Sequence, residues 1–288
     1  MSSATPSGTS GAPTEPPEKT GLRNAWGRVA REYDERWSAM TSGYLRRGLE
    51  QIHIPPDGHG LDVACGPGVT TAVLSDRLPQ GSALGVDFAP AMIERAEAEL
   101  GGHSGVAFAV DDAENLAQPD AAFDVVTCGF GLMYCLDARS AMRHMARVLR
   151  PGGVMLHAVW GPAPRVWWSP VIELIETRAE YFSAVCPMMF FYGLPGVLPR
   201  MVAEFGLEVV LEEHVVDQPM SFASAEEAAD TAILAGPLAG LYARRLEAAM
   251  QTEVRDALIA HVESVATRDG DTLHLPAEVG LVAGRRPG

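Results

Sequence analysis

The sequence has little of what marks several classes of protein. Its 288 residues include only four cysteines, with no C-x-x-C pair and no zinc-ligand spacing, so neither a disulfide framework nor a metal site is expected. Positive charge is scarce, because 22 Lys and Arg stand against 37 Asp and Glu, giving a formal net charge of -15. Such a surface repels phosphate backbones, so we expect no nucleic-acid partner.

Long apolar runs are also missing. No stretch reaches membrane-spanning length and no signal peptide is recognisable, so a membrane span is not expected. Cys65 and Cys128 lie in apolar stretches that predict buried strands, which favours reduced thiols in a cytoplasmic protein. The chain is 47% hydrophobic, enough for a sizeable core. Its composition leaves open whether it forms a homodimer.

The N-terminal part of the chain changes character near residue 22. Residues 1–21 are rich in Ser, Thr, Pro and Gly and predict a disordered tail, followed by a folded region over 22–288. Over 22–55, Trp26, Tyr33 and Trp37 belong to an apolar stripe with helical spacing. These helices pack on the sheet edge or, through Tyr33, cover a ligand, and the pattern leaves both open.

The central motif of the sequence is the nonapeptide over residues 60–68, GLDVACGPG. Leu61 and Val63 suit a parallel strand buried on both faces, and a helix is expected over 69–78. Gly66 and Gly68 allow the backbone to approach a ligand, and the free N–H groups at the helix start favour an anionic or polar group. Asp62 is expected to accept hydrogen bonds from the N–H groups of the turn or to bind a cationic ligand.

The form of this turn separates two families of nucleotide-binding proteins. The NAD-binding sequence requires a third glycine at the position of Thr71, which disfavours an NAD-dependent oxidoreductase. The acid-led D-x-x-C-G-P-G turn instead resembles motif I of the class I S-adenosylmethionine-dependent methyltransferases. This resemblance implies S-adenosyl-L-methionine as the cofactor, with its amino-acid end against the glycine turn.

A second acid follows the next predicted strand, over 83–88. Asp87 lies 21 positions after Gly66, which places its carboxylate at the carboxyl edge of that strand, within reach of a ribose diol. The alternative is that Asp87 caps the helix predicted over 91–100. Phe88, beside it, is expected to cover one face of the adenine.

The third strand, over 106–110, is followed by an acidic segment. Residues 111–116 resemble the G-D-A-E-x-L-P segment of the same family, with Asp111 in place of Gly and Ala117 departing from the usual pattern. The resemblance makes Asp112 the acceptor of the adenine amino group and Ala113 the donor to a ring nitrogen. A solvated acidic loop is the alternative.

The remaining motifs extend the resemblance and complete the expected fold. A fourth strand over 123–130, a helix over 138–149 and a fifth strand over 154–160 resemble the ubiquinone/menaquinone-biosynthesis type of methyltransferase, and the resemblance is strong over 60–160. It implies an α/β, Rossmann-like sheet of seven strands in the order 3-2-1-4-5-7-6, the last antiparallel, with helices on both faces. The cofactor-binding residues that follow are Tyr33, Asp62, Ala64, Gly66, Gly68, Asp87, Phe88, Met92, Asp112, Ala113, Cys128 and Gly129.

Beyond residue 160 the pattern is apolar, aromatic and interrupted by Pro and Gly. We expect helices over 171–185, 197–205, 225–235 and 238–266, and strands over 207–216 and 279–283. Residues 161–200 lie where the family inserts a substrate cap, and their large side chains (Trp167, Trp168, Met188, Met189, Phe190, Phe191 and Tyr192) suit an apolar pocket. A closed helical core is the alternative.

The predicted function is methyl transfer to an oxygen or carbon of a small apolar or aromatic molecule. The protein must align the two reactants and exclude water. A general base is expected at the carboxyl edges of strands four and five, where Tyr134 and His157 are the candidates, although His157 also suits a core position. Two alternatives remain: a protein that retains the cofactor for rearrangement or binding, and, less favoured, the NAD-type oxidoreductase.

Overall fold

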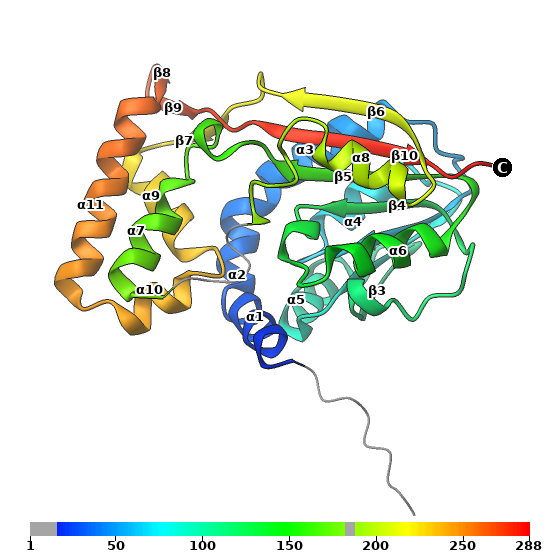
Figure 1. The fold of residues 1–288 in the computed structure, drawn as a ribbon, viewed down its shortest axis with the longest axis horizontal. Coiled ribbons are helices and arrows are strands. Elements are labelled where there is room, and N and C mark those ends of the chain that lie inside the picture. Colours follow the sequence, from blue (N-terminus) through cyan, green and yellow to red (C-terminus); the bar gives the residue numbers. More distant parts are fainter. Residues whose placement is uncertain (1–15, 182–187) are drawn as a thin grey trace, which may run out of the picture.

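The computed structural model describes residues 16–181 and 188–288, which build a seven-stranded sheet flanked by helices (Figure 1). The strands follow the order β3-β2-β1-β4-β5-β10-β6. Strands β1 to β5 are parallel, and β10 is antiparallel to both neighbours, so the predicted order is confirmed. Their bounds are β1 (His59–Val63), β2 (Ser82–Asp87), β3 (Val106–Val110), β4 (Phe123–Gly129), β5 (Leu149–Trp160), β6 (Glu208–Val215) and β10 (Val279–Arg285).

Two layers of helices cover the sheet. On one face α3 (Ala39–Glu50) and α4 (Val69–Ser75) bury Leu45, Leu49 and Leu74 against the central strands, with α5 (Pro90–Leu100) beside them. On the other face α6 (Ala138–Val148) and α8 (Val197–Glu204) pack against the sheet (Figure 1). Because both faces are covered, Leu61 and Val63 of β1 are fully buried, as a parallel strand of apolar residues requires.

The N-terminal helices begin earlier than the composition predicts. Helix α1 (Pro17–Arg28) has Pro17 at its first position, where the missing N–H is not needed, and Glu18 in its first turn. Residues 17–21 are therefore helical, a correction to the tail predicted over 1–21, whose residues 1–15 lie outside the described part. Helix α2 (Ala30–Tyr33) continues through one π-helical turn (Asp34–Ser38) into α3.

A group of elements that we call the cap covers the carboxyl ends of the parallel strands (Figure 1). It consists of α7 (Pro170–Ala179), α9 (Ala225–Leu234), α10 (Ala239–Arg245), α11 (Ala248–Val265) and a small sheet of β7 (Met220–Phe222), β9 (Thr272–Leu275) and β8 (Thr267–Asp269). The cap therefore extends well beyond the predicted 161–200, and the small sheet is a feature that the sequence analysis missed. Helix α7 ends at Ala179, before the predicted end at 185, and residues 182–185 lie outside the described part.

The single helix predicted over 238–266 is wrong, because the chain is extended at Leu246 and Glu247 between α10 and α11. The side-chain amide of Gln251 donates to the backbone carbonyls of Tyr242 and Leu246, which satisfies the end of α10. Every residue near the break is compatible with a helix, so the sequence pattern did not reveal the break.

The chain crosses between the sheet and the cap at adjoining points. Val166, after β5, forms an antiparallel bridge with Ala277, just before β10. Next to it Glu278, 4% exposed, accepts hydrogen bonds from Arg165 at 2.7 Å and from the Nδ1 atom of His214 at 2.9 Å. One buried carboxylate thus ties three crossing segments together.

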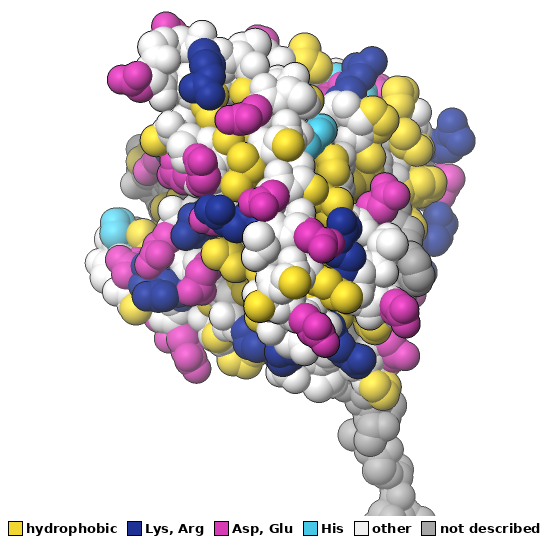
Figure 2. Space-filling view, turned by 90° about the vertical axis from the view of Figure 1, so that its left-hand side faces the viewer, with side chains coloured by type: hydrophobic (Ala, Val, Ile, Leu, Met, Phe, Trp, Pro, Cys, Tyr) yellow, Lys and Arg dark blue, Asp and Glu magenta, His cyan; other side chains and the backbone are white. Residues whose placement is uncertain are grey.

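The outer face of the cap carries charges of both signs. Figure 2 shows Lys and Arg interspersed with Asp and Glu on this face, without a large patch of one sign. Arg255 on α11 pairs with Asp230 on α9 at 2.7 Å, which links the two helices. Within the described residues, no helix combines the length and the apolar character needed to cross a membrane.

Candidate active site

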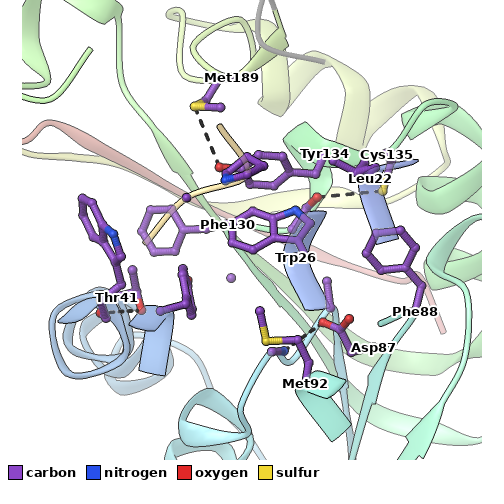
Figure 3. A pocket seen from close by; sticks show the side chains of 18 of the residues that line it. Leu22, Trp26, Thr41, Asp87, Phe88, Met92, Phe130, Tyr134, Cys135 and Met189 are labelled. Carbon is purple, nitrogen blue, oxygen red and sulfur yellow. Dashed lines mark hydrogen bonds between the residues drawn. The ribbon is translucent and has the colours of Figure 1, made fainter. Parts of the chain in front are cut away.

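A large pocket opens between the carboxyl ends of the strands, the N-terminal helices and the cap. Its empty volume is about 1220 Å³, part of it open to solvent. Asp87, Phe88 and Met92 lie on one side of it, and Phe130, Thr41 and Met189 lie toward the other (Figure 3). Ligands of open α/β sheets bind at this edge, where the strand order reverses between β1 and β4.

The glycine turn after β1 forms the floor of the pocket. Gly66 and Gly68 both have positive φ, +55° and +89°. A Cβ added to Gly66 would meet only the Tyr33 ring, at 3.8 Å, so this backbone faces the open space of the pocket. A Cβ on Gly68 would meet the Phe108 ring at 2.8 Å and Ala96 at 2.9 Å, so Gly68 faces the protein and permits close packing of α4.

Asp62 is fully buried behind the turn and does not line the pocket. Its carboxylate accepts hydrogen bonds from the hydroxyls of Thr70 at 2.6 Å, Thr71 at 2.8 Å and Thr127 at 2.8 Å. The expectation that backbone N–H groups of the turn would donate to it is therefore wrong, because hydroxyls from α4 and β4 fill that place. Asp62 thus fixes the start of α4 against the neighbouring strand.

Asp87 lines the pocket at the end of β2. One carboxylate oxygen accepts the N–H of Gly66 at 3.0 Å and the other accepts the N–H of Ala89 at 2.9 Å. The side chain therefore holds the glycine turn in place, and its further lone pairs can accept donors from a ligand. It does not occupy the N-cap position of α5, which is Ala89. Burial raises the pKa of Asp87 to about 6.

Lys19 of α1 forms ion pairs with two acidic residues that follow β3 in the pocket lining. Its ammonium group lies 2.5 Å from the Asp112 carboxylate and 2.7 Å from that of Glu114. Burial alone lowers the Lys19 pKa, but the two carboxylates outweigh it and hold that pKa above its ordinary value. Asp112 also accepts the N–H of Glu114 at 3.0 Å. The acidic segment is therefore paired by an N-terminal residue rather than being a solvated loop.

The other half of the pocket is aromatic. Phe130, directly after β4, has a φ of +60°, rare for a bulky residue, and its ring lies 4.5 Å from that of Trp160 at the end of β5. Trp37 from the π-helical turn and Trp168, just before α7 of the cap, complete this wall. Burial raises the pKa of Tyr33, between the two halves, to about 12, so its hydroxyl stays protonated at neutral pH.

Of the seven large residues of segment 161–200, two line the pocket and five do not, among them the half-buried Met188 and Phe190. Trp168 and Met189 line the pocket. Trp167 and Tyr192 are buried away from it, and Phe191 is exposed. The prediction that these side chains line one cavity is thus only partly met, because several of them form the apolar contact between cap and sheet.

The structure brings most of the predicted cofactor-binding residues to one pocket. Those that line it are Tyr33, Ala64, Gly66, Asp87, Phe88, Met92, Asp112, Ala113 and Gly129. Asp62, Gly68 and Cys128 lie behind this lining. Their direct contact with a cofactor stays a prediction.

The two predicted catalytic residues differ in position. Tyr134 lines the pocket, and its hydroxyl contacts the sulfur of Met189 at 3.8 Å. His157 is fully buried in β5, with Nε2 3.0 Å from the Met155 sulfur, and burial lowers its pKa to about 4. This geometry favours the alternative of a core histidine.

Sequence reasoning missed several lining residues. Lys19 was assigned to a tail, although Pro17 followed by Glu18 is a typical helix start. Trp160 is the last residue of a buried strand, and in such sheets that position faces the ligand. Residues 235–238, between α9 and α10, also line the pocket, and their Gly-Pro pair between apolar helices was the available signal.

Comparisons with known proteins agree with this geometry. A family model described as a methyltransferase domain matches residues 61–153. The chain is 32% identical to a demethylmenaquinone methyltransferase of Deinococcus radiodurans over 55% of its own length and 61% of that enzyme, so it spans less than two thirds of this relative. It is 37% identical to the demethylmenaquinone methyltransferase of Thermus thermophilus, over 55% of this chain and 82% of the relative.

A third relative and a solved structure extend the comparison. The ubiquinone/menaquinone biosynthesis C-methyltransferase UbiE of Desulfotalea psychrophila is 29% identical over 73% of this chain and 79% of its own. A putative methyltransferase from Bacillus halodurans superimposes with a TM-score of 0.59 at 17% identity, covering 85% of this chain and all of that structure. The last likeness shows the fold alone.

Proposed function

Because the chain belongs to the class I S-adenosylmethionine-dependent methyltransferases of the ubiquinone/menaquinone-biosynthesis type, we propose that it methylates a carbon of a small, uncharged aromatic molecule. One observation carries the proposal: a single pocket joins a polar end at β1, β2 and β3 to an aromatic end at β4, β5 and the cap. Carbon is chosen over oxygen because one relative is named a C-methyltransferase.

The polar end fits S-adenosylmethionine. Gly66 leaves open the space that a side chain would fill, and Asp87 keeps lone pairs for a ribose diol. Phe88 and Met92 offer apolar surfaces for the adenine, with Asp112 and Ala113 at its edge. When bound, the cofactor supplies an electrophilic methyl group on a sulfonium.

The aromatic end would orient the acceptor and keep water out. Among the described lining residues at the β4 and β5 side there is no histidine, and the one carboxylate that reaches this side, Glu114, is paired with Lys19 and the N–H of Leu136, which supports an uncharged acceptor. We propose that the hydroxyl of Tyr134 accepts a hydrogen bond from the group of the acceptor that loses a proton, because Tyr134 follows β4 and its hydroxyl lies at this end. Closing the site removes water that would compete for the methyl group.

The proposal predicts a pH dependence of cofactor binding. In the ligand-free fold, burial raises the pKa of Asp87 to about 6. The protonated carboxyl therefore stabilises the fold, fully below the ordinary pKa of an aspartate, and this contribution is lost as the pH rises through about 6. When the cofactor is bound, its ribose hydroxyls donate to Asp87 and so favour the ionised carboxylate instead. The affinity for S-adenosylhomocysteine should therefore be flat above pH 7 and fall about tenfold per pH unit below the Asp87 pKa.

Calorimetry over this pH range measures the effect. Asp87→Ala should weaken binding by roughly 1–3 kcal/mol at neutral pH, and Asp87→Asn should remove the pH dependence. An unchanged affinity in folded Asp87→Ala would mean that the carboxylate serves only to hold the glycine turn.

The function itself is tested in two steps. Titration with S-adenosylhomocysteine and with NAD should show binding of the first alone. The protein is then incubated with labelled S-adenosylmethionine and a two-ring hydroquinone kept reduced, and the product is analysed by NMR for a new methyl group on a ring carbon. Binding of NAD alone would refute the family assignment of the site, and cofactor binding without methyl transfer would favour the cofactor-retaining alternative.

A further inference from the structure

Helix α1 is attached to the rest of the fold mainly through a charged side chain. Its only buried residue is Lys19, which is 8% exposed, whereas Leu22 and Trp26 of the same helix are half-buried. Lys19 is also the only lysine among the 22 Lys and Arg residues of the chain. Because a lysine is rarely buried unless it is paired, the two ion pairs of Lys19 carry much of the attachment of α1.

The two acids that pair with Lys19 are fixed by other contacts. Asp112 accepts the N–H of Glu114 at 3.0 Å, and the second carboxylate oxygen of Glu114 accepts the N–H of Leu136 at 2.7 Å. Neither bond involves α1. Both carboxylates therefore keep their positions when Lys19 leaves them, and the ion pairs can form and break by movement of α1 alone.

Helix α1 crosses the polar end of the pocket, where it lies between α5 and α10 (Figure 1). Above the residues proposed for the adenine, the guanidinium carbon of Arg23 is 5.9 Å from the centroid of the Phe88 ring. Trp26 meets the ring of Tyr134 edge to face at 4.8 Å (Figure 3). The residues of α1 that line the pocket share one face of the helix, because they are spaced by three and four: Lys19, Leu22 and Trp26.

The chain can pivot directly after α1. The helix ends at Arg28, and Val29 leaves the helical conformation with a φ of -107° and a ψ of 9° before α2 begins at Ala30. Val29 and Ala30 are both buried, so the pivot is anchored in the fold while α1 is held beyond it by Lys19. A few residues at the end of an element are enough to absorb the motion of a lid.

We propose that α1 is a lid over the cofactor end of the pocket and that the ion pairs of Lys19 keep it closed, so that the cofactor enters and leaves only when they break. Because all three partners belong to the chain itself, the pairs close the lid with or without cofactor, and they slow entry and release alike. Lys19 is also a positioning residue, since the closed lid holds Trp26 against Tyr134. The inference rests on the proposed function only in placing the cofactor at the polar end.

The test measures cofactor exchange in Lys19→Met, which removes the charge and keeps a long unbranched side chain. Stopped-flow tryptophan fluorescence on the full chain gives the association and release rates of S-adenosylhomocysteine. Both rates should rise about tenfold, as expected for losing hydrogen bonds between charged groups, while the dissociation constant changes much less. A residue that only added affinity would change release and the dissociation constant together, so an unchanged association rate would overturn the inference.

Two further variants separate the lid from general effects of charge. Glu114→Gln removes one partner of Lys19 and should also raise both rates, and combining it with Lys19→Met should give no faster exchange than Lys19→Met alone. Additive effects in the double variant would contradict the inference. Arg150→Met is the matched control, because it breaks a 2.6 Å ion pair with Asp124 at the opposite end of β4, and it should keep the wild-type rates.

A second measurement needs no cofactor. Since the chain has one lysine, an amine-acetylating reagent has a single side-chain target, which mass spectrometry distinguishes from the N-terminal amine. Lys19 should be acetylated about tenfold more slowly in the wild type than in Glu114→Gln, because the closed lid protects it. Equal acetylation rates would overturn the inference. This result tests the lid even if the titration with S-adenosylhomocysteine fails, so the two proposals fail separately.

Discussion

Replacing Gly68 with alanine is expected to lower the free energy of unfolding by about 2–5 kcal/mol and to abolish measurable binding of S-adenosylhomocysteine. The left-handed backbone at this position costs a non-glycine residue roughly 1–2 kcal/mol. The added Cβ would also lie 2.8 Å from the Phe108 ring and 2.9 Å from Ala96, well inside van der Waals contact. Overpacking of this kind costs about 1–3 kcal/mol more, and the displaced turn no longer presents its N–H groups to the cofactor.

Gly206 offers the matched control. Its φ of +79° is close to the +89° of Gly68, but an added Cβ there would meet nothing within 4 Å. Gly206→Ala should therefore show only the backbone cost, roughly 1–2 kcal/mol, and normal cofactor binding. Urea unfolding of both variants separates the two contributions, and equal losses would show that the contact with Phe108 does not matter.

Replacing Asp62 with alanine should lower the free energy of unfolding by about 3–5 kcal/mol, since three hydroxyls lose their shared acceptor in the core. Thr71 and Thr127 are fully buried, so water cannot replace the carboxylate without entering the fold. The N-terminus of α4 then loses its link to β4, and the glycine turn is expected to bind cofactor more weakly.

Thr127→Val is the appropriate comparison, because it removes one hydroxyl and keeps the shape of the side chain. Its cost should be near 1 kcal/mol, the net value of a single hydrogen bond. Denaturant unfolding and cofactor titration are measured on both. A loss below about 1 kcal/mol in Asp62→Ala would contradict the role given to this network.

The central fold could be predicted because its signals are local. Inner strands such as β2 and β4 are short apolar runs that end at an acid or a glycine, Asp87 in β2 and Gly129 in β4. Burial on both faces of a parallel sheet demands this pattern, so strand positions and the order of the sheet followed from the sequence and the family resemblance.

The contacts that complete the site could not be predicted in the same way. Lys19 pairs with Glu114 across 95 positions, and Thr127 reaches Asp62 across 65. Nothing in the local sequence distinguishes these residues from a tail lysine or an ordinary strand threonine. The partner of Asp62 was therefore predicted wrongly, although its burial and its need for donors were inferred correctly.

The cap was underestimated for a related reason. Its helices α9 to α11 have ordinary helical patterns that do not show where they pack, and the segment at Gly236 reaches the pocket only through the tertiary arrangement. Apolar composition alone does not separate Trp167 in the core from Trp168 at the pocket.

The adjoining crossings between sheet and cap have an evolutionary consequence. Where Val166 pairs with Ala277, and Glu278 holds Arg165 and His214, the outgoing and returning chain lie side by side. Segments of other length or shape can be exchanged between such points without changing the distance that the chain must span. The methyltransferase domain match ends at residue 153, before the first crossing. Recombination at these junctions would let acceptor preference diverge between lineages while the cofactor half is inherited intact. The same adjoining position makes the two junctions suitable points at which to graft an engineered cap.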